Sequence, residues 1–299
     1  TAAGGNMSLA PVIICGMHRS GTSLVSRALD SIGLFTGDVK EHNNESVLFL
    51  TLNQWIFEQL NATWDNPANM RFVNDELAGY MLSVIGNILN GPSAVSYTGN
   101  DPAHRKILTA GNKLPWGWKD PRNTFTAEIW AAAFPDARLI HVCRNPLDVA
   151  DSLRRREQET EQRHKQQLAQ MKPEELDGTM RFQQSPRLFH LREGLAVWED
   201  YTLQAIGLEQ RFGANAIRVR YEDFLARPAQ ELARLAVFAG LEAGTEQLLA
   251  AVASFNPERR CAFSRNNELV TIYRDYRERY SMKALGYDRL TEDDRHTAA

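Results

Sequence analysis

Two glycines separated by four residues, Gly16 and Gly21, enclose a cationic and hydroxyl-bearing stretch near the start of the chain. The run reads Gly-Met-His-Arg-Ser-Gly-Thr-Ser. Glycines permit a tight turn and a close backbone approach, and N–H groups at the start of a following helix attract anions. In the ATP-binding version a lysine follows the second glycine, whereas Thr22 follows it here. We therefore expect a phosphate-binding loop in which Arg19 supplies the cation; an ordinary glycine turn is the alternative.

A second group of possible anion ligands follows the apolar run at 138–143. Arg144 comes directly after this run, Ser152 lies eight residues later, and Arg156 lies one helical turn beyond Ser152. Arginine offers a planar fork for bidentate phosphate contact, and residues four apart share one face of a helix. Alone, this pattern suits a surface arginine and a routine helix. Together with the first loop, it predicts a second phosphate anchor.

Both motifs resemble those of one enzyme family. The loop at 16–24 is similar to the 5′-phosphosulfate loop of sulfotransferases that use 3′-phosphoadenosine 5′-phosphosulfate (PAPS), and 144–152 resembles their 3′-phosphate segment. Bacterial, carbohydrate and protein-tyrosine sulfotransferases are nearest in these motifs. The resemblance covers roughly 11–241. It implies a P-loop nucleotide-binding fold that moves a sulfonate group to an acceptor hydroxyl and releases 3′-phosphoadenosine 5′-phosphate (PAP).

The resemblance also implies which residues contact the nucleotide. They come from the two motifs and from a Tyr-Glu-Asp segment at 221–223, and they are His18, Arg19, Ser20, Gly21, Thr22, Ser23, Arg144, Ser152, Arg156 and Tyr221. For Tyr221, packing in the core is nearly as good an interpretation. Arg259, Arg260 and Arg265 are further candidates from the C-terminal region.

Sulfonate transfer needs a base for the acceptor hydroxyl, positive charge for the transferring group, and in-line alignment. The resemblance implies Glu45 as the base, with Glu41 and His42 as alternatives. It implies Arg19 and Lys119 as the cations, because Lys119-Asp120-Pro121 resembles a family segment whose lysine contacts the sulfonate. A helix-start acid and a weak surface ion pair are the plainer interpretations of Glu45 and Lys119.

Apolar runs and helical periodicities alternate along the chain. Strands are expected at 11–15, before Asp120, at 138–143 and at 216–219, and helices at 22–33, 45–60, 75–89, 124–134, 148–156, 188–212, 228–240 and 245–252. This alternation predicts an α/β fold with a central parallel sheet flanked by helices. Ligands bind such sheets at the carboxyl ends of the strands, where the motifs lie.

The length of 299 residues fits one large domain, expected over 8–290. Residues 61–112 and the charge-rich 154–186 are expected to form the acceptor side or a lid. Residues 1–7 are expected to be a short added segment before a natural start at Met7, and the polar end after 291 to lack order.

The net charge of −3 argues against nucleic acid as a partner, so any phosphate binding must be local. Three sparse cysteines predict a reducing, cytoplasmic setting without disulfides. The sequence offers no metal-ligand cluster and no run long enough to span a membrane. The oligomeric state cannot be derived from these patterns.

The expected acceptor is a carbohydrate or glycolipid hydroxyl; a peptidyl tyrosine or another small molecule is the alternative. Four tryptophans are candidates for stacking on sugar faces or for the core: Trp55, Trp64, Trp116 and Trp118. A P-loop kinase is a further alternative, and it requires an acidic metal ligand, for which Asp120 is the candidate. The last alternative is a protein that binds the nucleotide without catalysing a reaction.

Overall fold

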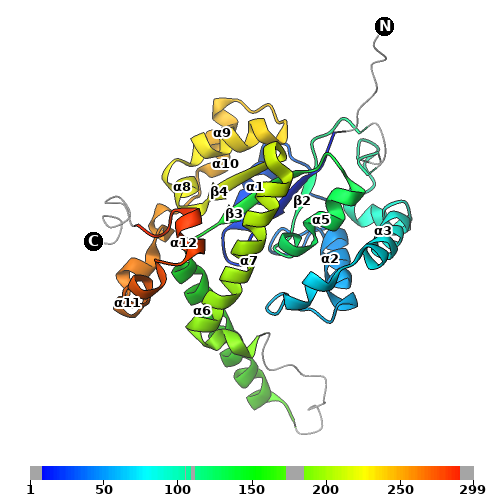
Figure 1. The fold of residues 1–299 in the computed structure, drawn as a ribbon. Helices are drawn as coiled ribbons and strands as arrows, with labels where there is room; N and C mark the ends of the chain where they lie inside the picture. Colours follow the sequence, from blue (N-terminus) through cyan, green and yellow to red (C-terminus); the bar gives the residue numbers. More distant parts are fainter. Residues whose placement is uncertain (1–8, 105, 109–111, 173–184, 290–299) are drawn as a thin grey trace. The chain divides into compact units, whose positions relative to one another are not determined.

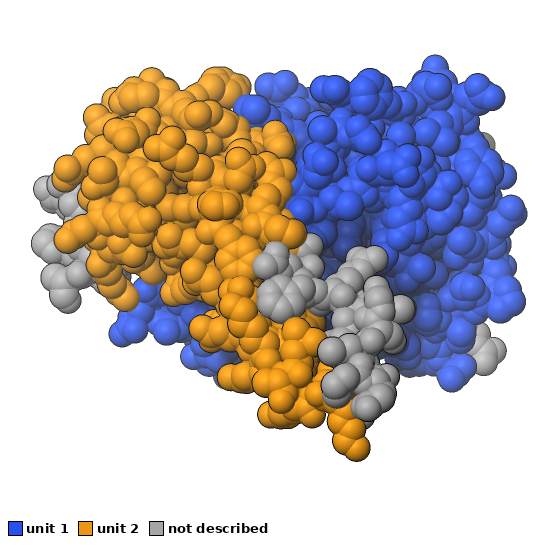
Figure 2. All heavy atoms as spheres, turned by 90° about the horizontal axis from the view of Figure 1, so that it is seen from below, with its two compact units in different colours: residues 1–143, 201–260 blue, residues 144–200, 261–299 orange. Residues whose placement is uncertain are grey.

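The computed structural model describes residues 9–104, 106–108, 112–172 and 185–289. The chain divides into two compact units, coloured separately in Figure 2. The first contains residues 1–143 and 201–260, and the second contains residues 144–200 and 261–299. The expectation of one domain over 8–290 stays a prediction.

A sheet of four parallel strands forms the centre of the first unit, in the order β2-β1-β3-β4 (Figure 1). The strands are β1 (Val12–Cys15), β2 (Gly117–Lys119), β3 (Arg138–Cys143) and β4 (Ala216–Arg220). The predicted parallel sheet flanked by helices is confirmed. The predicted strands agree to within a residue, except that the second contributes only the three residues of β2.

Helices cover both faces of this sheet. Those wholly within the first unit are α1 (Thr22–Ser31), α2 (Val47–Gln59), α3 (Asp75–Leu89), α4 (Val95–Thr98), α5 (Asn123–Ala133), α8 (Tyr221–Ala226), α9 (Pro228–Ala239) and α10 (Thr245–Val252). The boundary between the units falls inside α7 (Leu191–Phe212), so its second half belongs here. The helices expected at 75–89 and 245–252 are confirmed residue for residue.

Side chains of β1 alternate between two cores, as the pleat of a strand requires. Ile13 and Cys15 pack into a core shared with α2, α3 and α5. Val12 and Ile14 pack into a second core shared with α1 and α9. Because the strand is buried on both faces, its sequence is a continuous apolar run, which is why it was predictable.

The second unit contains α6 (Pro146–Gln170), the first half of α7, α11 (Asn267–Tyr276) and α12 (Tyr280–Leu285). The helix predicted at 148–156 was too short, because the charge-rich stretch continues it. Arg, Glu and Gln are good helix formers, and pairs such as Glu161–Lys165, 2.8 Å apart, support α6 at a spacing of four. Of the lid predicted at 154–186, residues 173–184 lie outside the described residues.

None of the helices in the described part of the chain is long and apolar enough to cross a membrane.

A partly buried charge cluster joins β3, β4 and α7 in the first unit. Nδ1 of His141 lies 2.6 Å from Oε1 of Glu209, and Nε of Arg218 donates to the same oxygen at 2.8 Å. His141 and Arg218 are neighbours in the register of β3 and β4. Burial by itself raises the pKa of Glu209, but the hydrogen bonds from His141 and Arg218 outweigh it and lower the pKa to about 2. The cluster therefore holds α7 against the sheet.

Replacing Glu209 with Gln should lower the free energy of unfolding at neutral pH by about 2 kcal/mol, after allowance for solvent screening. A carboxylate with a depressed pKa stabilises the fold above its unfolded value, 4.5, and that stabilisation is lost as the pH falls toward about 2. Urea unfolding across this pH range should show that the difference in free energy of unfolding between wild type and Glu209→Gln decreases as the pH falls.

The matched control is Glu128→Gln, which breaks an ion pair with Arg211 whose side chains are both about half exposed. Its cost should stay below about 1 kcal/mol and should depend little on pH. If the free energy of unfolding of Glu209→Gln differs from that of wild type by the same amount at every pH, the stabilising role of the Glu209 charge is contradicted.

Candidate functional site

The loop between β1 and α1 requires both of its glycines. Gly16 has φ +135°, and a Cβ there would lie 2.1 Å from the carbonyl oxygen of Val142. Gly21 has φ +98°, and a Cβ there would lie 2.3 Å from the ring of Tyr221. Any side chain would therefore clash at either position, and the loop predicted from the glycine spacing is present at the carboxyl end of β1.

Polar contacts hold this loop against its surroundings. The Gly16 amide donates to Oγ1 of Thr124 at 3.1 Å. The hydroxyl of Ser20 is fully buried and lies 2.6 Å from the Met17 carbonyl oxygen and 3.0 Å from that of Val142. The Ser20 hydroxyl therefore shapes the loop. The predicted contact of Ser20 with a nucleotide stays a prediction, and it would involve the backbone N–H rather than the hydroxyl.

Helix α1 begins directly after the loop, with Gly21 as its N-cap and no side-chain cap. The N–H groups of a first helical turn have no partners within the helix, and the helix dipole makes this end attractive to anions. Arg19 is exposed and adopts the left-handed conformation, φ 69°. Thr22 is buried and Ser23 is half-buried. The loop and the start of α1 together have the chemistry that suits an anionic group.

Lys119 and Glu45 form a buried ion pair at the carboxyl end of β2. Nζ of Lys119 lies 2.6 Å from Oε1 of Glu45 and donates to the Ser23 hydroxyl at 3.1 Å. The side chains are 1% and 11% exposed. Burial lowers the pKa of Lys119 below its usual 10.5, although the Glu45 carboxylate opposes this. Two predicted catalytic residues and the start of α1 thus meet within hydrogen-bond distance.

Glu45 is presented by a tight turn before α2. Lys40 and Ser46 form an isolated antiparallel bridge, and the Glu41 amide donates to the Glu45 carbonyl oxygen at 2.8 Å. Asn44 has φ 66°, and its amide side chain donates to the Ser26 hydroxyl of α1. Of the three candidates for the base, Glu45 alone is buried against Lys119, whereas the side chains of Glu41 and His42 are exposed.

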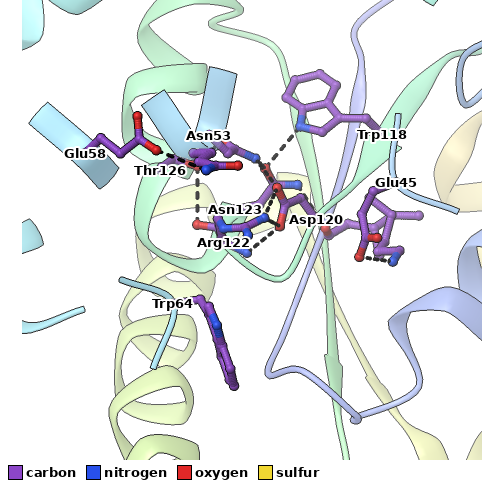
Figure 3. A network of polar contacts seen from close by, with 12 residues as sticks. Glu45, Asn53, Glu58, Trp64, Trp118, Asp120, Arg122, Asn123 and Thr126 are labelled. Carbon is purple, nitrogen blue, oxygen red and sulfur yellow. Dashed lines mark hydrogen bonds and ion pairs between the residues drawn. The ribbon is translucent and has the colours of Figure 1, made fainter. Parts of the chain in front are cut away.

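Asp120, which directly follows Lys119, is fully buried. Its Oδ1 accepts from the Arg122 amide at 2.9 Å, and its Oδ2 accepts from Nδ2 of Asn53 at 3.0 Å and lies 3.3 Å from the Arg122 guanidinium (Figure 3). Both oxygens are therefore engaged in holding the chain after β2. This gives no support to Asp120 as the metal ligand of a kinase.

The four tryptophans divide between the core and the loop. Trp116 and Trp118 are 2% and 0% exposed, so the core alternative is confirmed for both, and Phe49 stacks on Trp118 with ring centroids 3.9 Å apart. Trp55 is half-buried near Tyr80.

Trp64 is half-buried and lies beside the phosphate loop. Its ring centroid is 4.6 Å from that of His18. The hydroxyl of Tyr201 donates to the Trp64 carbonyl oxygen at 2.8 Å and so fixes the segment that carries this ring. The His18 ring of the loop therefore packs against Trp64, and Trp64 is the candidate tryptophan that lies nearest to the predicted phosphate-binding loop.

A cavity of about 460 Å³ lies along α1 and α8 and is lined in part by Tyr221, whose ring also packs against Gly21 of the loop. Its lining includes Leu24, Arg27, Tyr221, Phe255, Asn256 and Arg259. Two aromatic rings, an amide and two guanidinium groups suit a flat polar ring with anionic substituents. Sequence patterns did not single out Arg27, Phe255 or Asn256, because a helix residue and a loop after α10 show no spacing that joins them.

The second predicted anchor belongs to the second unit. Arg144 directly follows β3, its guanidinium lies 3.7 Å from Asp148, and its carbonyl oxygen accepts from the Trp198 indole at 3.0 Å. Arg156 bonds the fully buried Glu157 at 2.7 Å. Ser152 is half-buried on α6. The hydrogen bond to Glu157 orients the guanidinium group of Arg156, whereas the distance from Arg144 to Asp148 is too long for a hydrogen bond.

A family model described as the sulfotransferase family matches residues 11–247, well over half of the chain. The comparison with curated proteins gave no match.

Among solved structures, a sulfotransferase from Alicyclobacillus acidocaldarius is 18% identical, with coverage of 96% of this chain and 98% of that one and a TM-score of 0.46. A sulfotransferase domain from the curacin biosynthetic pathway is 18% identical, with coverage of 81% and 77% and a TM-score of 0.45. A sulfotransferase from Mycobacterium avium is 18% identical, with coverage of 82% and 68% and a TM-score of 0.42. These values describe a distant likeness.

Replacing Gly21 with Ala should destabilise the fold by about 2 kcal/mol, because the new Cβ would meet the Tyr221 ring in a backbone conformation that only glycine adopts easily. Gly79→Ala is the matched control, since that glycine lies within α3 and a Cβ there would meet nothing within 4 Å outside its own helix. It should stabilise the helix by about 0.5 kcal/mol. Urea unfolding measures both, and equal changes would contradict the close packing of Tyr221 on the loop.

Proposed function

The chain belongs to the sulfotransferase family, and we propose that it moves a sulfonate group from PAPS to a hydroxyl of a carbohydrate or glycolipid acceptor. The observation that carries this proposal is the buried pair of Lys119 and Glu45, 2.6 Å apart, beside the hydroxyl of Ser23 at the start of α1. A carboxylate for the proton and an ammonium for the anion are the two groups that the reaction requires.

The residues around the loop fit PAPS. Gly16 and Gly21 let the loop pack directly against Val142 and Tyr221, and the start of α1 offers N–H groups and a positive dipole to the 5′-phosphosulfate. The cavity beside the loop, with the rings of Tyr221 and Phe255 and the amide of Asn256, is proposed to hold the adenine. Arg259, one of the C-terminal arginines predicted to close over the nucleotide, also lines it.

The remaining nucleotide contacts stay as proposals from the sequence motifs. Arg144, Ser152 and Arg156 are proposed to bind the 3′-phosphate. Arginine at this position suits a doubly charged group, since its fork makes two hydrogen bonds to one phosphate. His18, Arg19, Thr22 and Ser23 are proposed to line the 5′ side.

The donor, when bound, supplies the sulfonate group and a phosphate leaving group. Glu45 is proposed to accept the proton of the acceptor hydroxyl. Lys119 has three N–H donors and gives one to Glu45 and one to Ser23. An anion at the start of α1 would compete with Glu45 for this charge, and Lys119 turning toward the anion would leave Oε1 of Glu45 available to accept a hydroxyl proton. Arg19 adds a further exposed cation from the loop.

The acceptor class rests on Trp64. Its half-buried ring beside His18 offers a flat apolar surface of the kind that sugar rings stack on. A tyrosine side chain or another small phenol would suit the same base. The kinase alternative gains nothing, because no lysine follows Gly21 and both oxygens of Asp120 are engaged.

Calorimetric titration with PAP, AMP and ATP should show tight binding of PAP alone. Arg144→Ala should weaken PAP binding about 30-fold, because a charged hydrogen-bond partner of the 3′-phosphate is lost, and should leave AMP binding nearly unchanged. Arg155→Ala is the matched control, since that side chain is 62% exposed and paired with Asp151 on the same helix. Preference for ATP over PAP would overturn the proposed donor, and equal losses for PAP and AMP would overturn the role of Arg144.

Radiolabelled PAPS and a panel of monosaccharides, glycolipids and tyrosine peptides would identify the acceptor. With that acceptor, Glu45→Gln should lower kcat by about 10³-fold, since a general base contributes this much, while PAP affinity changes little. Glu58→Gln is the control, because Glu58 is exposed on α2 and bonds only Gln54 among the contacts described. Unchanged turnover in Glu45→Gln, or a comparable loss in Glu41→Gln, would remove Glu45 from the proposed mechanism.

A further inference from the structure

We propose that Asn53 is a positioning residue, which holds Lys119 and Glu45 in the geometry of the reaction. This inference rests on the proposed function for its catalytic meaning. Asn53 lies on α2 and is 0% exposed, with no direct contact to either catalytic side chain among the hydrogen bonds described. Its effect must therefore pass through its partners.

The side chain of Asn53 uses its complete hydrogen-bonding capacity (Figure 3). Its Nδ2 donates to Oδ2 of Asp120 at 3.0 Å and to Oδ1 of Asn123 at 2.8 Å. Its Oδ1 accepts from the Thr126 hydroxyl and from the Trp130 indole, each at 2.8 Å. An amide has two N–H donors and two lone pairs, so both the position and the orientation of this group are fixed.

These partners hold the chain on both sides of Lys119. Asp120 directly follows Lys119, and the indole of Trp118, which directly precedes it, donates to Oδ1 of Asn123 at 3.0 Å. Nδ2 of Asn123 donates to the Ile14 carbonyl oxygen of β1 at 3.0 Å. The backbone of Lys119 is therefore fastened on either side to one buried network centred on Asn53.

The same helix determines the position of Glu45. Glu45 lies two residues before the start of α2, and Ser46 is the N-cap residue between them. Since Asn53 ties α2 to the end of β2 and to α5, it fixes the helix that presents the carboxylate relative to the strand that presents the ammonium. A displacement of about 1 Å is enough to cost a large part of a catalytic rate.

Stability alone is a poor explanation for this network. Replacing a buried polar network with packed apolar groups is often neutral or stabilising, while a fully satisfied network specifies one geometry. The surroundings would suit an apolar residue, because Leu52, Ile56 and Phe57 of the same helix pack in the core. An asparagine with four hydrogen-bond partners at this position is therefore explained better by its role in fixing α2 relative to β2 than by a gain in the free energy of folding.

The test compares Asn53→Ala with Ile56→Ala, a control on the same buried face of α2 that removes packing but no hydrogen bond. Lysine ammonium groups are followed by ¹H–¹⁵N NMR on the full chain, with the Lys119 signal assigned by its loss in Lys119→Arg. In wild type, burial and the bonds to Glu45 and Ser23 should slow its exchange with water. Asn53→Ala should speed this exchange at least about tenfold, and Ile56→Ala should leave it within about twofold.

The second measurement is turnover with the acceptor found in the panel. Asn53→Ala should lower kcat about 100-fold and change the Kd for PAP less than about threefold, whereas Ile56→Ala keeps kcat at a temperature where both variants are folded. Thr126→Val removes one of the four hydrogen bonds at nearly constant volume. It should give a smaller change of the same sign, and it replaces Asn53→Ala if that variant does not fold.

The outcomes separate this inference from the proposed function. Equal behaviour of the Asn53 and Ile56 variants in ammonium exchange and in kcat would overturn the positioning role. Absence of PAP binding by the wild type would overturn the proposed function, and the ammonium measurement would still decide whether Asn53 holds Lys119. A Thr126→Val variant indistinguishable from wild type in both measurements would also count against the network.

Discussion

The ion pair between Lys119 and Glu45 constrains the rest of the first unit, because it is almost removed from water. Taking both charges out of solvent costs several kcal/mol for each ion, and their attraction compensates only when the geometry is good. At 2.6 Å, with Ser23 as a further partner of the ammonium, the geometry is good. The strand, the turn before α2 and the start of α1 must therefore meet at one point, and each is fastened separately.

The parallel sheet makes this meeting possible. Carboxyl ends of parallel strands face the same edge, so the loop after β1, Lys119 at the end of β2 and Tyr221 after β4 gather there. Two glycines then let the backbone of the loop approach Val142 and Tyr221 more closely than any side chain permits. The cluster of Glu209 with His141 and Arg218 secures α7 against the same strands.

The parallel sheet, most helices of the first unit and the loop after β1 were predictable, because they depend on short-range patterns. Apolar runs identified the strands, and the spacing of Gly16 and Gly21 identified the loop. The network around Asn53 was not predictable, since its partners lie about 70 residues away in sequence. For Trp116 and Trp118 the sequence left sugar stacking and core packing open for a similar reason: a tryptophan beside a motif gives no sign of which way its ring packs.

The overall charge of the chain gives a misleading impression of its affinity for anions. The net charge is −3, yet Arg19 lies in the loop before the start of α1, and Arg27 and Arg259 line the cavity. At physiological ionic strength charges farther apart than about 8 Å are largely screened, so the local cations determine what binds. Carboxylates elsewhere on the surface are therefore compatible with the proposed nucleotide site.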